Sequence, residues 1–243
     1  MATCDTVQKL RQAAPLITAG VLAADVLNLG RELQRVQEAG VRLLHFDVMD
    51  GRFCPALTFG PAFVKGVKTG LLKDVHLMIA EPIDRLRDYV QAGADIVAIN
   101  IETTVHIHRA LQLLGEMENA NDPARGLVRG VVLNPGTPLE ALAPLLGQLE
   151  AVYLLAVNPG APGQGFIPET KARLARLKAL VKKSQRDILV GVDGGVTREN
   201  IAEIAALGPD IIVAGTAVFK GDPLANARRL IEAAQQAAGR AGP

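Results

Sequence analysis

The chain has 243 residues, of which 49% are apolar and 21% charged, and its formal net charge is +1. This balance is typical of a globular protein with a sizeable core, and no basic cluster predicts binding to nucleic acid. No run of about 18 apolar residues occurs, so we expect no membrane span and no membrane partner.

The only cysteines are Cys4 and Cys54, which form neither a disulfide framework nor a closely spaced metal-binding pair. The first residues, Met1 to Ala14, include Asp5 and lack the apolar core of a signal peptide. Together these features predict a protein of the reducing cytoplasm.

Short apolar runs rich in β-branched residues alternate with helical patterns along the whole chain. The eight predicted strands are Ile17–Leu22, Val41–Gly51, Asp74–Met78, Asp95–Asn100, Leu127–Leu133, Val152–Val157, Ile188–Val192 and Ile211–Ala214. The predicted helices are Asn28–Ala39, a short one ending at Thr69, Pro82–Gln91, Thr103–Glu116, one beginning at Pro138, Pro168–Lys183, Thr197–Leu207 and Pro223–Ala238.

This order of elements predicts an α/β protein with a parallel sheet covered by helices. Eight strand–helix units in about 250 residues match a (β/α)₈ TIM barrel, and a doubly wound open sheet is the alternative. No linker divides the chain, so we predict one domain over residues 1–243. Residues 1–14 would be an N-terminal extension and residues 239–243 a C-terminal tail.

The predicted strand around His45 carries an unusual set of side chains on one face. Because successive strand residues point to opposite faces, His45, Asp47 and Met49 share a face. An imidazole beside a carboxylate and a soft thioether suggests a metal or acid–base site. The alternative is an ordinary strand end with one hydrogen-bonded histidine and one aspartate that caps a loop.

In a barrel the active site lies at the carboxyl ends of the strands. Two histidines and two aspartates meet there: His45, Asp47, His76 and Asp193. Nitrogen and oxygen donors suit one divalent ion, Zn²⁺, Fe²⁺, Mn²⁺ or Co²⁺. The alternative for each histidine is a hydrogen-bonded core residue. Further polar residues at the predicted rim are Asp50, Asn100, Glu102, Asn134 and Asn158.

Glycine-rich turns follow the last two predicted strands, as Asp193-Gly194-Gly195 and Ala214-Gly215-Thr216. Loops at these two positions commonly bind phosphate in barrels. The Gly/Pro-rich segment 158–165, with Gly160 and Gly163, suits a lid over the ligand. No GxGxxG pattern is present, so we expect no nucleotide cofactor.

From about Ile17 to Ala234, the chain resembles the ribulose-phosphate 3-epimerase family. The motifs that carry the resemblance are His45-Phe46-Asp47-Val48-Met49-Asp50-Gly51, Asp74-Val75-His76-Leu77-Met78, Asn158-Pro159-Gly160, Gly163-Gln164, Phe166-Ile167-Pro168 and Val192-Asp193-Gly194-Gly195-Val196. Their order and spacing both match the family.

The resemblance implies an isomerase that interconverts D-ribulose 5-phosphate and D-xylulose 5-phosphate in pentose phosphate metabolism. Asp47 and Asp193 would be the acid–base pair as well as metal ligands, acting through an enediolate. Met49 and Met78 would line the site, and the phosphate would be held by residues of the two glycine-rich turns: Gly195, Gly215 and Thr216. The family also implies a homo-oligomer, either a dimer or a hexamer.

Four positions depart from the family's usual pattern. A serine of the first strand is replaced by Gly20, a histidine of the fourth strand by Asn100, an asparagine by Ala56, and a lid glycine by Pro162. Gly20, Asn100 and Ala56 remove hydrogen-bond partners near the sugar, and Pro162 stiffens the lid. These changes leave two alternatives open: a 3-epimerase of another ketose phosphate, such as a hexulose 6-phosphate, or a non-catalytic sugar-phosphate binding protein.

Overall fold

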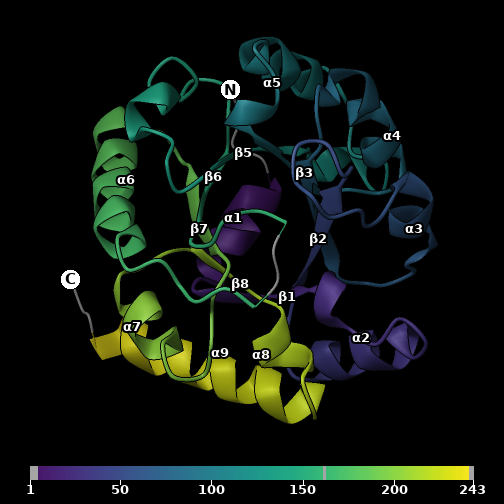
Figure 1. Ribbon diagram of the computed structural model, residues 1–243, viewed down its shortest axis with the longest axis vertical. Helices are drawn as coiled ribbons and strands as arrows, with labels where there is room; N and C mark the ends of the chain where they lie inside the picture. The colour runs from purple at the N-terminus through teal and green to yellow at the C-terminus, as the bar shows by residue number, and fades with distance from the viewer. Residues whose placement is uncertain (1–4, 161–162, 241–243) are drawn as a thin grey trace.

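A computed structural model, which describes residues 5–160 and 163–240, shows a closed barrel of eight parallel strands (Figure 1). Each strand pairs with the next along the chain, and β8 pairs with β1. The strands are β1 (Leu16–Gly20), β2 (Leu43–Met49), β3 (Leu72–Met78), β4 (Ile96–Asn100), β5 (Val128–Leu133), β6 (Ala151–Leu155), β7 (Leu189–Asp193) and β8 (Ile211–Ala214). The predicted TIM barrel is confirmed.

Helices form a ring outside the strands (Figure 1). The α-helices are α1 (Asp5–Gln12), α2 (Leu29–Glu38), α3 (Pro61–Gly66), α4 (Leu86–Gln91), α5 (Ile107–Gly115), α6 (Thr170–Ser184), α7 (Ile201–Ala206), α8 (Thr216–Phe219) and α9 (Pro223–Arg240). The 3₁₀ segments are Val21–Ala23, Pro82–Arg85, Ile101–Thr103, Pro123–Arg125 and Leu139–Leu142.

The α2 helix illustrates how the sequence sets these elements. Leu33 and Val36, three residues apart, are its buried residues and face the barrel. Gly40, with φ of +101°, lies just past its end, where a left-handed residue is needed to turn the chain into β2.

Two predicted helices differ in the structure. The segment after β5 that was expected to form a helix from Pro138 contains only a 3₁₀ stretch, Leu139–Leu142, and turns. The helix expected from Thr103 begins only at Ile107. Thr103, Thr104 and Val105 explain the late start, because β-branched side chains lose rotamer freedom in a helix.

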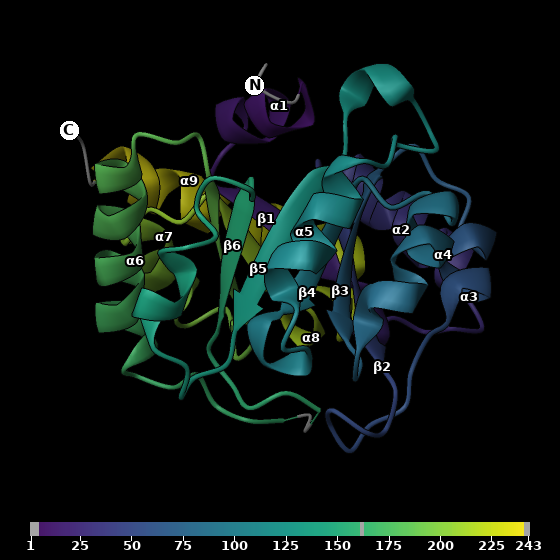
Figure 2. The ribbon, with the colours of Figure 1, turned by 90° about the horizontal axis from the view of Figure 1, so that it is seen from above.

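The N-terminal segment expected to be an extension contains α1, which closes the amino-terminal end of the barrel (Figure 2). Val7 and Leu10 of α1 are buried against the apolar side chains of the barrel interior, including Leu43 and Leu189. A second, larger core lies between the outer faces of the strands and the helices. One end of the barrel is thus sealed, and the opposite rim holds the functional residues.

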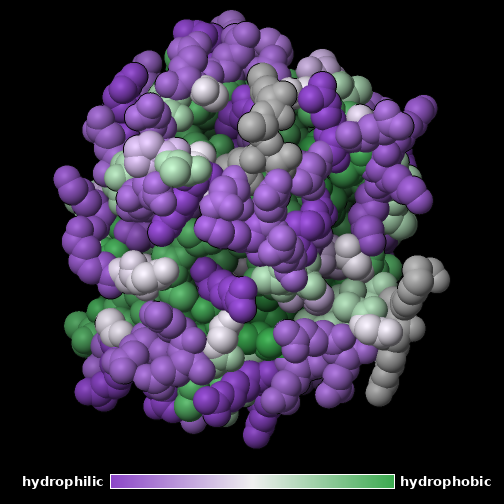
Figure 3. Space-filling view, turned by 180° about the vertical axis from the view of Figure 1, so that it is seen from behind, coloured by the Kyte–Doolittle hydropathy of each residue, from purple (hydrophilic) through white to green (hydrophobic). Residues whose placement is uncertain are grey.

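The face on the α1 side is mostly hydrophilic (Figure 3). Over residues 5–160 and 163–240, no helix combines the length and apolar character required to cross a membrane.

Candidate metal and active site

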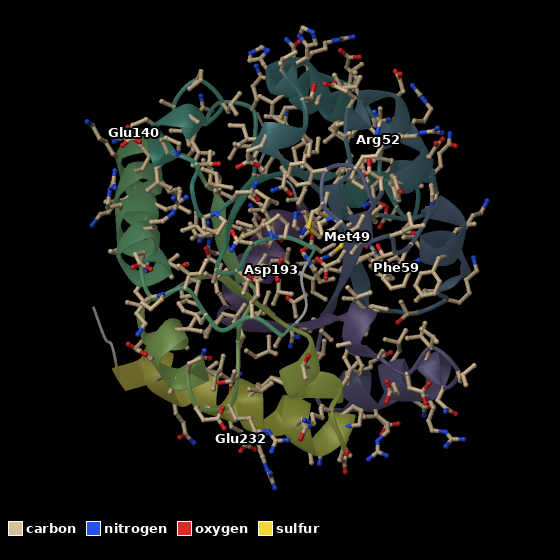
Figure 4. The ribbon with its side chains drawn as sticks, viewed as in Figure 1. Met49, Arg52, Phe59, Glu140, Asp193 and Glu232 are labelled. Atoms are coloured by element: carbon tan, nitrogen blue, oxygen red, sulfur yellow. The ribbon has the colours of Figure 1, made fainter. Side chains whose placement is uncertain are left out.

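Three strands, β2, β3 and β7, bring the four predicted metal ligands together at the carboxyl-terminal rim. His45 and Asp47 lie two residues apart on β2, so both point into the barrel. His76 is the register partner of Asp47 on β3, and Asp193 is the last residue of β7. Figure 4 shows Asp193 near the centre of the barrel.

The donor atoms of the four side chains all lie within 4.8 Å of one another. His45 Nε2 is 3.3 Å from Asp47 Oδ1 and 3.6 Å from Asp193 Oδ2. His76 Nδ1 is 3.5 Å and 3.7 Å from the same two oxygens. Both nitrogens are buried without a hydrogen bond of ordinary geometry. Ligands that share one Zn²⁺ lie about 3–3.5 Å apart, since each is about 2.1 Å from the ion. The donor set therefore fits a divalent cation.

The four groups shift one another's pKa values. Burial disfavours the charged imidazole of His45, but the charges of Asp74 and Asp47 outweigh it and raise the pKa of His45 well above its usual value. Burial opposes protonation of His76 as well, yet the nearby carboxylates of Asp193 and Asp47 raise its pKa to about 9. Without a metal, the site therefore holds protonated rings at neutral pH.

The two carboxyl groups respond in the opposite direction. Burial alone would raise the pKa of Asp47 and of Asp193, but His45 and His76 lower both below the usual value. The two aspartates keep some solvent contact, with side chains 17% and 12% exposed, whereas the imidazoles are almost completely buried. Ionised carboxylates thus face the open side of the barrel.

Each imidazole is held from behind by a different partner. His45 Nδ1 lies 2.8 Å from Asp74 Oδ2, with both side chains buried. His76 Nε2 lies 2.7 Å from Asn100 Oδ1. Because an acceptor occupies that side of each ring, the hydrogen is placed there and the other nitrogen is left for the site.

Asn100 belongs to a network on the rim. Its Nδ2 donates to Glu102 Oε2 at 3.2 Å and to Asn134 Oδ1 at 3.0 Å. Glu102 Oε1 accepts from the backbone N–H of Asn134 at 2.9 Å and from the Thr137 hydroxyl. Arg173 on α6 donates to the carbonyl oxygens of Asn134, Pro135 and Thr137. The polar residues predicted at the ends of β4 and β5 thus hold the β5 loop and His76 together.

Met49 and Met78 are register partners at the ends of β2 and β3. They form a small buried cluster with Cys54, against which Phe53 and Ala56 pack. Cys54 is not among the four grouped metal-ligand candidates. The two methionines therefore form an apolar wall beside the four polar ligands.

The predicted phosphate turns lie next to one another. Gly195 has φ of +67°, and a Cβ there would lie 2.6 Å from the backbone nitrogen of Phe166, so glycine is required at this close approach. Gly194 precedes it, and Gly215 and Thr216 open the short helix α8 after β8. The structure thus places these residues at the ends of adjacent strands.

Gly160 of the predicted lid segment lies against the β2 loop. A Cβ at Gly160 would be 2.7 Å from the Cβ of Cys54. Gln164 Nε2 donates to the carbonyl of Asn158 at 2.6 Å, which joins the two ends of the segment. Gly163 lies between them, and Pro162 lies outside the described residues.

Two residues have roles that the sequence did not indicate. Asp50, predicted as a rim residue, accepts hydrogen bonds from the backbone amides of Arg52, Phe53 and Ala80, so it shapes the β2 loop. Asp74 belongs to one of the motifs that carry the family resemblance, but the sequence alone gave no function for it. Its register partner on β2 is His45, and an acidic residue two positions before His76 on the same strand face was a signal that could have indicated it.

Comparison with known proteins gives consistent results. The Ribulose-phosphate 3 epimerase family matches residues 16–219. Ribulose-phosphate 3-epimerase from Escherichia coli (strain K12) is 41% identical over 208 residues, 84% of this chain and 88% of the relative. The enzyme of the same name from Rhodobacter capsulatus is 42% identical over 84% of this chain and 86% of the relative. Chloroplastic ribulose-5-phosphate-3-epimerase from Arabidopsis thaliana is 36% identical over 96% of this chain and 81% of the relative.

Solved structures with low sequence identity share the fold. 3-Hexulose-6-phosphate synthase from Salmonella typhimurium has a TM-score of 0.66 at 16% identity and covers 91% of this chain and 99% of its own. KGPDC from Streptococcus mutans, solved in complex with a ligand, has a TM-score of 0.66 at 12% identity and covers 91% and 98%. At such identities the similarity extends to the barrel alone.

Proposed function

The chain belongs to the ribulose-phosphate 3-epimerase family, and from this premise we propose that it interconverts D-ribulose 5-phosphate and D-xylulose 5-phosphate by epimerisation at C3. Family membership confirms the predicted enzyme class, an isomerase. The observation that carries the proposal is the cluster of His45, Asp47, His76 and Asp193 at the barrel rim. Its chemistry matches what removal of a proton beside a carbonyl requires.

The same four residues would hold one divalent metal ion, Zn²⁺, Fe²⁺, Mn²⁺ or Co²⁺. When bound, such an ion stabilises the negative charge that develops on the substrate's oxygens. Asp74 and Asn100 orient the two imidazoles toward this position. No nucleotide cofactor is required, because the reaction moves only a proton.

Asp47 and Asp193 would exchange the C3 proton. One carboxylate accepts the proton from C3 while the C–H electrons shift toward the C2 carbonyl oxygen, and the other aspartic acid returns a proton to the opposite face of C3. The two residues come from different strands, β2 and β7, so they approach the substrate from different sides of the barrel.

The remaining predicted contacts would bind the rest of the substrate. Backbone amides of Gly194, Gly195, Gly215 and Thr216 would hold the phosphate, and Met49 and Met78 would cover the reacting carbons. Gly160 and Gly163 would belong to a lid that excludes water. We further propose a homo-oligomer, a dimer or hexamer, that works in the cytoplasm and has no nucleic-acid partner. A single domain over residues 1–243 is also proposed.

The test is a coupled assay for D-xylulose 5-phosphate, run with the protein loaded with each of the four metals in turn. Solvent deuterium should appear at C3 of the substrate at a rate that matches turnover. Metal content of the purified protein should be about one ion per chain. Absence of turnover with every metal would reject this substrate.

A second candidate substrate is another ketose phosphate, such as a hexulose 6-phosphate. The supporting observation is Gly20, which lies beside His45 in the β1–β2 register and presents no side chain to the sugar. Ala56 and Asn100 are two further positions at which the predicted sugar site differs from the family's usual pattern. Comparing kcat/KM across a panel of pentulose and hexulose phosphates distinguishes the two substrates.

A further inference from the structure

Tyr153 on β6 is the aromatic residue of the apolar cluster in the barrel interior. The residue is 1% exposed, and its neighbours in the cluster are aliphatic residues of the other strands and of α1. Its ring centroid lies 6.3 Å from that of His45. A phenol hydroxyl is thus buried among apolar side chains next to a predicted metal ligand.

Gly191 on β7 makes room for this ring. Tyr153 and Gly191 are register partners in the β6–β7 pair. A Cβ at position 191 would lie 2.3 Å from Cδ1 of the ring, closer than two carbon atoms can approach. The absence of a side chain at Gly191 therefore permits the observed position of Tyr153.

The buried oxygen atoms that lack a hydrogen-bond partner among the described residues include Tyr153 Oη and Asp74 Oδ1. The second oxygen of Asp74, Oδ2, is the one that holds His45 Nδ1. Burial raises the pKa of Tyr153, and the neighbouring Asp74 raises it further through its charge and its contact with the hydroxyl. The phenol therefore keeps its proton and can donate a hydrogen bond. Asp74 Oδ1 is a carboxylate oxygen to which no other group of the described residues donates a hydrogen bond.

We propose that Tyr153 is a positioning residue for the metal site. Its hydroxyl donates to Asp74 Oδ1, and Asp74, held through both oxygens, fixes His45 with Nε2 toward the other three ligands. This inference rests on the proposed metal site, but it concerns a side chain that touches neither the metal nor the substrate. It explains the presence of a hydroxyl among mostly apolar side chains, where an unpaired one would be unfavourable.

The decisive variant is Tyr153→Phe, which removes only the hydroxyl. Tyr89→Phe is the matched control, because Tyr89 is the other tyrosine of the chain and lies on α4, outside the barrel. The first measurement is the NMR spectrum of the imidazole N–H groups in metal-free protein labelled with ¹⁵N-histidine. Of the four histidines, His106 and His108 are exposed and their ring protons exchange with water. The buried His45 Nδ1–H and His76 Nε2–H should remain visible.

Tyr153→Phe should shift the His45 Nδ1–H signal and speed its exchange with water, and should leave the His76 signal in place as an internal control. Tyr89→Phe should change neither. An unchanged His45 signal in Tyr153→Phe would overturn the proposal, whatever happens to the melting temperature. If Tyr153→Phe did not fold, the deuterium isotope shift on the Tyr153 ¹³Cζ of the wild-type protein would decide. Its absence would show that the hydroxyl is unpaired and would overturn the proposal.

The second measurement is the Zn²⁺ dissociation constant, obtained by competition with a chromogenic chelator. Tyr153→Phe should weaken Zn²⁺ binding about tenfold, the lower end of the range for groups that orient metal ligands. In an Asp74→Asn background the same substitution should have little further effect, since the two residues act in series. An equal loss of Zn²⁺ affinity in the wild-type and Asp74→Asn backgrounds would show that Tyr153 does not act through Asp74. If the wild-type protein bound no metal, the proposed function would fail, while the imidazole signals would still decide the role of Tyr153.

Discussion

The two imidazoles of the site are held in unlike ways, one from the core of the barrel and one from its rim. His45 is held by the buried carboxylate of Asp74, beside Tyr153 in the barrel interior. His76 is held by the neutral amide of Asn100, which leads to the exposed Glu102. Figure 4 shows how densely side chains fill the space around this centre, with Met49 and Asp193 marking it.

One part of the site is fixed by the folding of the barrel, and the other part depends on its loops. Asp74 lies within a strand and is completely buried, so its position follows from the barrel itself. Asn100 ends β4 and contacts residues of the β5 loop, so its position depends on that loop being in place. A charged partner also holds an imidazole more strongly than a neutral one.

The largest effect should follow from replacing what both imidazoles share, the carboxylates between them. Asp47→Asn or Asp193→Asn should each slow deuterium exchange at C3 by about 10²–10⁴-fold, because each removes an acid–base group. Circular dichroism should show an intact fold. Asp222→Asn, an exposed carboxylate paired with Arg35, is the control and should retain wild-type exchange. Near-normal exchange in either site variant would exclude that residue as base or acid.

Next in size is the pH dependence of the metal-free protein. The pKa of His76 is raised from 6.5 to about 9 in the folded chain, so protonation favours folding. This stability is complete below pH 6.5 and is lost as pH rises through about 9, an effect on the order of 3 kcal/mol. Urea unfolding at several pH values measures it. Excess Zn²⁺ should reverse the trend, since the metal competes with protons for the imidazoles. A metal-free stability that stays constant over this range would contradict the raised pKa.

The support of His45 from the barrel core can be tested by substitution of Asp74. Asp74→Asn keeps the shape of the side chain but removes its charge, and should weaken Zn²⁺ binding by about 10- to 100-fold. Chelator competition measures the loss. Asp187→Asn, which removes an exposed carboxylate at the opposite end of β7, serves as the control. Affinity equal to that of the wild type would mean that the charge behind His45 is unimportant.

The partner of His76 can instead be changed to a carboxylate, as in the pairing of His45 with Asp74. Asn100→Asp combined with Glu102→Gln places a carboxylate behind His76 without changing the net charge. Because a charged acceptor binds the imidazole N–H more strongly, Zn²⁺ affinity should rise by a factor of about three. Glu102→Gln alone is the control and should change the affinity little. An equal gain in that control would assign the effect to Glu102 rather than to the acceptor of His76.

The sequence was sufficient to predict the barrel and the four grouped side chains. Alternation along one strand places His45 and Asp47 on one face, and the closed topology brings His76 and Asp193 to them. The residues that hydrogen-bond to the metal-ligand candidates were harder to predict from the sequence. The pairing of His45 with Asp74 depends on the register between β2 and β3, which apolar patterning does not reveal.

Other features depended on packing across the barrel. Val7 and Leu10 are spaced as on a helix, but nothing local shows that α1 closes the barrel end. Tyr153 was only one more residue of an apolar strand. The proposed pairing of its hydroxyl with Asp74 would join β6 to β3, strands that are not neighbours in the sheet. The role of each metal-ligand candidate stays a prediction until a metal is measured.

The contact between the Tyr153 ring and Gly191 has a consequence for how this lineage could change over time. Any side chain at position 191 would collide with the ring, so the two sites should show strong epistasis. Among homologues, bulk at position 191 should occur together with a smaller residue at position 153. The ancestral order of substitution would then be constrained, with the loss of a side chain at 191 preceding the arrival of the tyrosine.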